Sequence, residues 1–238
     1  MSSLKRYLSK THDPYTNVIL VLPLFVAYQI GILATGGVRN GVDFMTDLLF
    51  LAAGHDFWNY IAINLAVLVG LAIALFALRK KGSFRLSVWP KVIAESTVYA
   101  VFLGSGIIAV MRNLGMSHLL ASGATGGYDL WDKLVLSIGA GMYEELVFRL
   151  FLTGGLFLLG TKVLDWSKWI AVLFAVLLSS AAFSGIHYIG SLGDTFTLGS
   201  FMFRFFAGVI LAVIFYLRGF AVAVYTHAIY DILVMVFP

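Results

Sequence analysis

Seven apolar stretches, each long enough to cross a lipid bilayer, follow one another along this chain of 238 residues. They cover residues 17–36, 58–78, 90–111, 133–160, 169–189, 199–217 and 219–237. A transmembrane helix needs about 20 predominantly apolar residues. Charged residues make up only 12% of the chain, whereas a soluble domain carries about 25%. The sequence therefore predicts an all-α, polytopic bundle of transmembrane helices, folded as one membrane-embedded domain over residues 1–238.

A further apolar segment, 43–54, is too short to cross a bilayer and predicts a re-entrant or interfacial helix. With it, the expected number of spans is about seven to eight. Residues 112–132 contain scattered apolar side chains and are expected to form an external loop or a surface helix. The first stretch is too long for the apolar core of a signal peptide, so we expect it to remain as a span.

The distribution of lysine and arginine predicts the orientation of the bundle, because these residues favour the cytoplasmic side of a membrane. Eleven of them lie in segments on the side of the N-terminus, and three lie on the other side. The eleven are Lys5, Arg6, Lys10, Arg79, Lys80, Lys81, Arg85, Lys91, Lys162, Lys168 and Arg218, and the three are Arg39, Arg112 and Lys133. We therefore expect a multi-pass protein of the cell (inner) membrane with its N-terminus inside and its C-terminus outside.

Two adjacent glutamates lie in the middle of the fourth stretch, in the sequence Glu144-Glu145-Leu-Val-Phe-Arg149. A charged side chain at the bilayer centre costs about 2.5–3.5 kcal/mol on insertion scales. Residues four apart share one face of a helix, so Glu145 and Arg149 are expected to pair. Glu144 is turned about 100° away and is expected to face another group. A purely structural ion-pair network that braces the helices is the alternative.

Two histidines lie in later apolar stretches. Phe183 and His187 share one helix face in the fifth, and His227 and Asp231 share one in the seventh. A carboxylate one turn from an imidazole can fix its tautomer and its orientation. Glu144 with these histidines and Asp231 has the parts for activating a water and stabilising an oxyanion. Each histidine alone is also compatible with a simple interhelical hydrogen bond.

Together these motifs resemble the CAAX-protease and bacteriocin-processing (CPBP) family of intramembrane glutamic endopeptidases. The three motifs are Glu144-Glu145-Leu-Val-Phe-Arg149, Phe183-Ser-Gly-Ile-His187 and His227-Ala-Ile-Tyr-Asp231. They occur in the order and in the separate late spans that the family shows, and the resemblance covers residues of about 137–238. It implies a peptide hydrolase that needs neither a cofactor nor a metal.

The resemblance also implies a role for each matched residue. Glu144 would be the general base that activates water, assisted by His187, and His227 with residue 231 would form the oxyanion site. The family often has asparagine at this last position, whereas this chain has Asp231. An ionised aspartate cannot donate a hydrogen bond. We therefore expect Asp231 to orient His227 and to leave the donation to that ring.

The remaining matched residues are expected to support the site. The resemblance implies that Glu145 and Arg149 hold the architecture, and Phe183 is expected to pack and to shape a substrate groove. Two other charges in apolar stretches, Glu95 and Arg204, are expected to form a structural ion pair with each other or to meet a substrate terminus.

Other functions remain open at this point. The candidate carboxylates and imidazoles are all legitimate zinc or iron ligands, although His-Glu-x-x-His is absent and the imidazoles come from different spans. The absence of cysteine excludes disulfides, thiolate nucleophiles and cysteine-ligated metals. The chain could also be a non-catalytic immunity or binding protein, or an ion-coupled transporter, but no inverted repeat favours transport.

The expected partners are the lipid bilayer and a membrane-associated protein or peptide substrate. Nothing indicates nucleic acid binding, because the basic residues follow membrane topology. His187 lies near the outer end of its span, which predicts a site that opens to the external side. Exported or membrane-anchored substrates, such as C-terminal sorting segments or peptides, would fit that side. A CAAX-type protease for prenylated proteins is the alternative.

Overall fold

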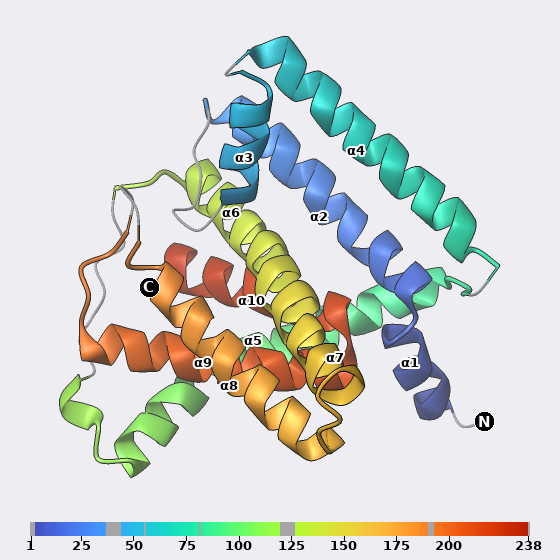
Figure 1. The fold of residues 1–238 in the computed structure, drawn as a ribbon. Helices are drawn as coiled ribbons and strands as arrows, with labels where there is room; N and C mark the ends of the chain where they lie inside the picture. Colours follow the sequence, from blue (N-terminus) through green and yellow to red (C-terminus); the bar gives the residue numbers. More distant parts are fainter. Residues whose placement is uncertain are drawn as a thin grey trace.

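The computed structural model describes residues 3–36, 44–54, 56–80, 82–119, 127–189 and 193–237, and every regular element within them is helical. The longer helices are α2 (Pro14–Ala34), α4 (Phe57–Leu78), α5 (Trp89–Asn113), α8 (Lys168–Ile186), α9 (Leu198–Arg218) and α10 (Phe220–Val236). Shorter elements are α1 (Ser3–Thr11), α3 (Phe44–Ala52), η1 (Leu86–Val88) and η2 (Ser117–Leu119). Figure 1 shows α4 at one edge of the bundle, beside α2. The all-α prediction is confirmed for these residues.

Five helices are long and apolar enough to cross a membrane: α2, α4, η1 with α5, α8 and α9. Five of the seven predicted spans fall on these helices. The seventh prediction corresponds to α10, an apolar helix of 17 residues. The predicted short element at 43–54 contains α3, although Asp43 itself lies outside the described residues, as does Arg39. The total of seven to eight spans stays a prediction.

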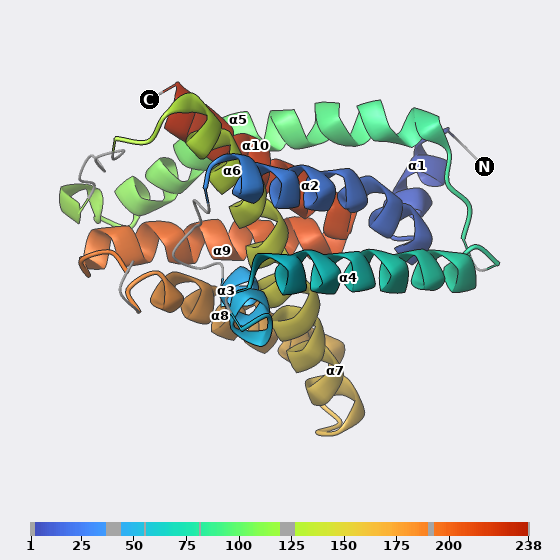
Figure 2. The ribbon, with the colours of Figure 1, turned by 90° about the horizontal axis from the view of Figure 1, so that it is seen from above.

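The fourth predicted span, 133–160, lies within one unbroken helical segment from Leu130 to Lys162, here called the glutamate helix. It consists of α6 (Leu130–Gly139), η3 (Ala140–Glu144), η4 (Leu146–Thr153) and α7 (Gly154–Lys162). Both η3 and η4 are π-helical, and such wide turns are frequent at functional sites. Figure 2 shows the α7 end of the glutamate helix projecting beyond the other helices. Glu144 is thus the last residue of η3, and Glu145 lies between the two π-helical segments.

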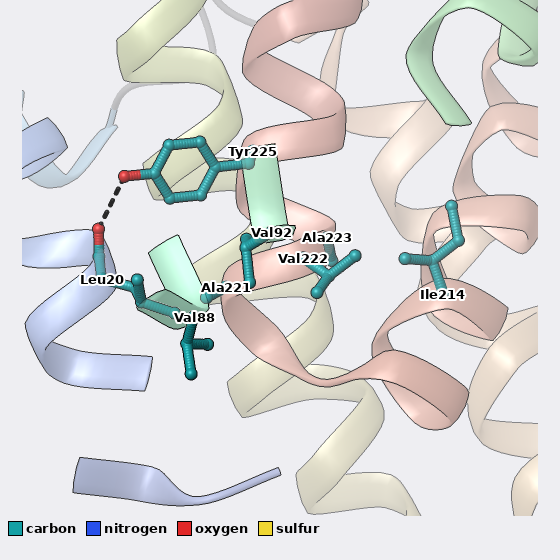
Figure 3. Close-up of a cluster of buried hydrophobic side chains, with 8 residues drawn as sticks. All are labelled: Leu20, Val88, Val92, Ile214, Ala221, Val222, Ala223 and Tyr225. Carbon is teal, nitrogen blue, oxygen red and sulfur yellow. Dashed lines mark hydrogen bonds between the residues drawn. The ribbon is translucent and has the colours of Figure 1, made fainter. Parts of the chain in front are cut away.

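Helix α10 is the buried centre of the bundle. All of its residues from Ala221 to Ala228 are buried. Figure 3 shows the apolar cluster in which Leu20 of α2, Val92 of α5 and Ile214 of α9 surround the first turns of α10. In the same cluster the Tyr225 hydroxyl donates a hydrogen bond to the Leu20 carbonyl oxygen at 2.9 Å. These contacts fix the helix that carries His227.

Glu95 joins three elements at one end of the bundle. Its carboxylate accepts hydrogen bonds from Arg218 Nε at 2.5 Å, from the Tyr7 hydroxyl at 2.5 Å and from the Tyr99 hydroxyl at 2.9 Å. Burial, together with the neighbouring Glu95 carboxylate, raises the pKa of the Tyr7 phenol, so the phenol keeps the proton that it donates. The start of α5, the end of α9 and helix α1 therefore lie at the same end.

The expected pair between Glu95 and Arg204 is wrong. Arg204 lies nearer the other end of α9, where its guanidinium forms an ion pair with Asp194 and donates to the Tyr188 hydroxyl at 3.0 Å. Because α5 and α9 are antiparallel neighbours, a residue near the start of α5 reaches the end of α9, and Arg218 takes the place foreseen for Arg204.

The predicted orientation can be tested by single-cysteine labelling, because the chain has no cysteine of its own. Ser83 lies in the α4–α5 connection, and Thr195 lies in the α8–α9 connection; both residues are exposed. With the N-terminus inside, a membrane-impermeant maleimide added to intact cells should label Thr195→Cys and leave Ser83→Cys unlabelled until the cells are opened. The unmodified chain is the control, and the reverse labelling pattern would contradict the orientation.

Candidate active site

Glu145 connects two helices in the interior of the bundle. Its Oε1 accepts a hydrogen bond from Nδ1 of His227 on α10 at 2.8 Å, and its Oε2 lies 3.0 Å from Nε of Arg149. Glu145 and Arg149 are both fully buried. The expected ion pair is confirmed, and Glu145 also orients His227. That second task was expected of Asp231, whose Oδ2 lies 3.6 Å from the other ring nitrogen, beyond hydrogen-bond distance.

Glu144 faces two imidazoles from two other helices. Its Oε2 lies 3.8 Å from Nε2 of His187, at the end of α8, and 3.8 Å from Nε2 of His227. Nδ1 of His187 donates to the Phe183 carbonyl oxygen at 2.7 Å, which leaves Nε2 of a neutral ring as a hydrogen-bond acceptor. Three helices that are distant in sequence thus bring one carboxylate oxygen and two ring nitrogens together.

The ring of Phe183 packs against the imidazole rings of His187 and His227. Its ring centroid lies 5.1 Å from that of His187 and 5.9 Å from that of His227. The Arg149 guanidinium carbon lies 4.4 Å from the same centroid, a cation–π distance. With 3% of its surface exposed, Phe183 packs against the site, as expected, and excludes water from one side of it.

The more exposed residues of the candidate site include His187, at the C-terminal end of α8. The side chains of His187 and Asp231 are 16% and 23% exposed, whereas those of Glu144 and Glu145 are 3% and 0% exposed. Asp194 of the α8–α9 connection forms an ion pair with Arg204 of α9, and Arg204 also donates to the hydroxyl of Tyr188, the residue after His187. The open side of the site is therefore the α8–α9 side.

A glycine permits the close approach of α10 to the glutamate helix. A Cβ atom on Gly141 would lie 2.6 Å from the backbone nitrogen of Ala228 and 2.8 Å from its Cα. Ala228 follows His227, so this contact sets the distance between His227 and the glutamate pair. Gly139 is similarly covered, by the Tyr28 ring. The space beside these two glycines is therefore occupied by residues of α2 and α10.

The side chains of Glu144, His187, His227 and Asp231 are of types that can bind zinc or iron. Among the residues that the structure describes, no group of three or more histidine, cysteine, aspartate or glutamate side chains has the arrangement of a metal site.

The comparison with known families gives one match. Residues 126–233 match the family model described as type II CAAX prenyl endopeptidase Rce1-like. The match contains all three motifs of the sequence. No curated protein and no solved structure matches the chain.

Two contacts of the site were not foreseen. The Glu145–His227 hydrogen bond joins residues 82 positions apart, and no spacing within one helix could have indicated it. Tyr143, directly before Glu144, accepts a hydrogen bond from Gln29 of α2 at 2.8 Å. The signal available for the second contact was a lone glutamine in the first apolar stretch, since polar side chains at that depth are rare.

Substitution of Gly141 tests whether the contact with α10 builds the site. Gly141→Ala would place a methyl group against backbone atoms that cannot move aside, and such overpacking costs about 1–3 kcal/mol. We expect a lower melting temperature in detergent and loss of any activity that needs His227.

Gly155→Ala is the matched control on the same helix. Among the described residues, nothing outside the helix's own backbone lies within 4 Å of the position that a Cβ would take there. Alanine in a helix is favoured over glycine by about 1 kcal/mol. The melting temperature of this variant should be unchanged or higher. Equal melting temperatures for the two variants would contradict the role assigned to Gly141.

Proposed function

We propose that this chain, whose residues 126–233 belong to the Rce1-like group of the CPBP family, is an intramembrane endopeptidase of the glutamic type. The observation that carries the proposal is the position of Glu144. Its carboxylate oxygen lies 3.8 Å from each of two imidazole nitrogens that come from different helices. A water molecule that contacts all three atoms would lie between the Glu144 carboxylate, which can accept a proton, and the two imidazole nitrogens.

In the proposed first step Glu144 acts as general base. The attacking water donates one hydrogen bond to the Glu144 carboxylate and one to Nε2 of His187, which is an acceptor because its Nδ1 donates to the Phe183 carbonyl. Glu144 takes the first proton as the water oxygen bonds to the scissile carbonyl carbon. A positioned base of this kind contributes about 10²–10⁴-fold to the rate.

His227 is the proposed donor to the oxyanion. Because its Nδ1 donates to Glu145, its Nε2 can donate only when the ring is doubly protonated and positively charged. The carboxylates of Glu144, Glu145 and Asp231 lie 3.8, 2.8 and 3.6 Å from ring nitrogens and would balance that charge. A preorganised donor of this kind contributes about 10²–10³-fold.

The second step returns the proton. The tetrahedral intermediate collapses, its C–N bond breaks, and the leaving nitrogen takes the proton from Glu144, which is again a carboxylate. The products are a new carboxyl terminus and a new amino terminus, and the water oxygen remains in the carboxyl group. Arg149 keeps Glu145 charged throughout, and neither residue exchanges protons in this sequence. No step requires a metal.

The proposed substrates are membrane-associated or exported proteins and peptides. The more exposed residues of the site lie on the α8–α9 side, which is external if the N-terminus is inside the cell. Cleavage of C-terminal sorting segments or exported peptides would fit that side. Cleavage of prenylated proteins is the second candidate, favoured by the description of the matching family. It would require the site to open to the cytoplasm.

Cleavage by the purified protein tests the proposal. A fluorogenic membrane-peptide library, containing prenylated and unmodified members, would be incubated with the wild type and with Glu144→Gln, each with and without a metal chelator. We expect the wild type to cleave in both conditions and Glu144→Gln to lose about 10²–10⁴-fold of the activity without loss of folded protein.

The other outcomes separate the alternatives. Activity that is abolished by the chelator would indicate a metal bound by the same carboxylates and imidazoles, and it would contradict the metal-independent mechanism. Full activity of Glu144→Gln would exclude Glu144 as the base. A wild type that cleaves no member but retains a peptide tightly would favour a binding protein.

A further inference from the structure

A chain of hydrogen bonds connects the peripheral helix α4 to the residue before Glu144. The Tyr60 hydroxyl of α4 donates to Oε1 of Gln29 on α2 at 2.5 Å. Nε2 of Gln29 in turn donates to the Tyr143 hydroxyl at 2.8 Å. The side chains of Tyr60, Gln29 and Tyr143 are all buried, with 1%, 9% and 5% of their surfaces exposed. One amide thus bridges two phenols from two other helices.

We infer that Gln29 and Tyr60 are positioning residues for Glu144 and that they act through Tyr143. The inference rests on the proposed function, since it assigns them to the reaction of that site. Tyr143 and Glu144 share a peptide bond inside the π-helical turn η3. Their side chains leave the helix in different directions, one toward α2 and the other toward α8 and α10. A rotation of this turn that moves Tyr143 therefore moves Glu144.

The π-helical turn is fixed by lateral contacts on opposite sides. On one side Gly141 lies against Ala228 of α10. On the other side Tyr28 of α2 covers Gly139 and makes an edge contact with the Tyr143 ring, at 5.4 Å and 72°. The hydrogen bond from Gln29 to the phenol oxygen holds the far end of the Tyr143 side chain.

Tyr60, at the other end of the hydrogen-bond chain, connects α4 to the turn that holds Glu144. Only two residues of α4 are buried, Tyr60 and Asn64. Phe50 of α3 stacks on the Tyr60 ring at 4.1 Å and 7°, and Asn64 Nδ2 donates to the Tyr60 carbonyl oxygen at 3.0 Å. Tyr60 is therefore the most deeply buried contact of α4, while Val67, Leu68 and Leu71 pack partly buried against the same core further along the helix. A displacement of α4 at Tyr60 would reach the turn that holds Glu144.

Three variants break this chain at different points. Gln29→Leu removes both hydrogen bonds at similar volume, whereas Tyr60→Phe and Tyr143→Phe each remove one hydroxyl. Misplacement of a reacting group by about 1 Å can cost about 10²-fold in rate. We expect each variant to lower kcat by about tenfold or more, with little change in KM. The double variant Tyr60→Phe/Tyr143→Phe should be no slower than Gln29→Leu, because all three changes interrupt the same chain.

Tyr7→Phe is the matched control. It also removes one phenol hydroxyl that bonds to another helix, but at Glu95, away from the site. Its melting temperature should fall as much as that of Tyr60→Phe, while its kcat stays that of the wild type. A merely structural role for Tyr60 predicts the same kcat for both variants.

A second readout does not need a substrate. The NMR signals of labelled His187 and His227, assigned from His187→Gln and His227→Gln, report on the surroundings of Glu144. We expect both signals to shift in the three variants and not in Tyr7→Phe. Unchanged histidine signals and an unchanged kcat would overturn the inference. If the wild type cleaves nothing while the signals shift, the proposed function fails and the positioning of Glu144 stands.

Discussion

The whole site depends on one buried carboxylate, that of Glu145. One of its oxygens holds Nδ1 of His227 at 2.8 Å and the other lies 3.0 Å from Nε of Arg149. A buried charge is tolerated when it is paired, and removal of one partner leaves an uncompensated charge that costs about 3–5 kcal/mol. Glu145 therefore ties α10 to the glutamate helix and also decides which nitrogen of His227 faces Glu144. The carboxylate of the neighbouring Glu144 faces the two imidazole nitrogens instead.

Much of this arrangement follows from the sequence, because its strongest signals act within one helix. Hydropathy predicted where the helices lie, since a bilayer demands long apolar segments. The four-residue spacing predicted the Glu145–Arg149 pair, because that contact is made within a single helix. The same spacing predicted that Phe183 and His187 share a face, and their rings are in contact. The family match covers these motifs.

The contacts between helices could not be predicted in this way. Periodicity shows which face of a helix is special but not which helix that face meets, so the hydrogen bond from His227 to Glu145 was missed. Glu95 was assigned to Arg204, although Arg218 lies on the same helix and at the depth that an antiparallel neighbour requires. The π-helical turns were also missed, since the same residues are compatible with a regular α-helix.

The central claim is that Glu144 activates a water and does not itself attack the peptide. Cleavage over many turnovers in ¹⁸O-labelled water, followed by mass spectrometry of product and enzyme, separates the two reactions. The account predicts one ¹⁸O atom in the new carboxyl terminus of the product and none in the peptide of the enzyme that contains Glu144. Incorporation of ¹⁸O into Glu144 would show a covalent acyl intermediate on that carboxylate and would contradict the account.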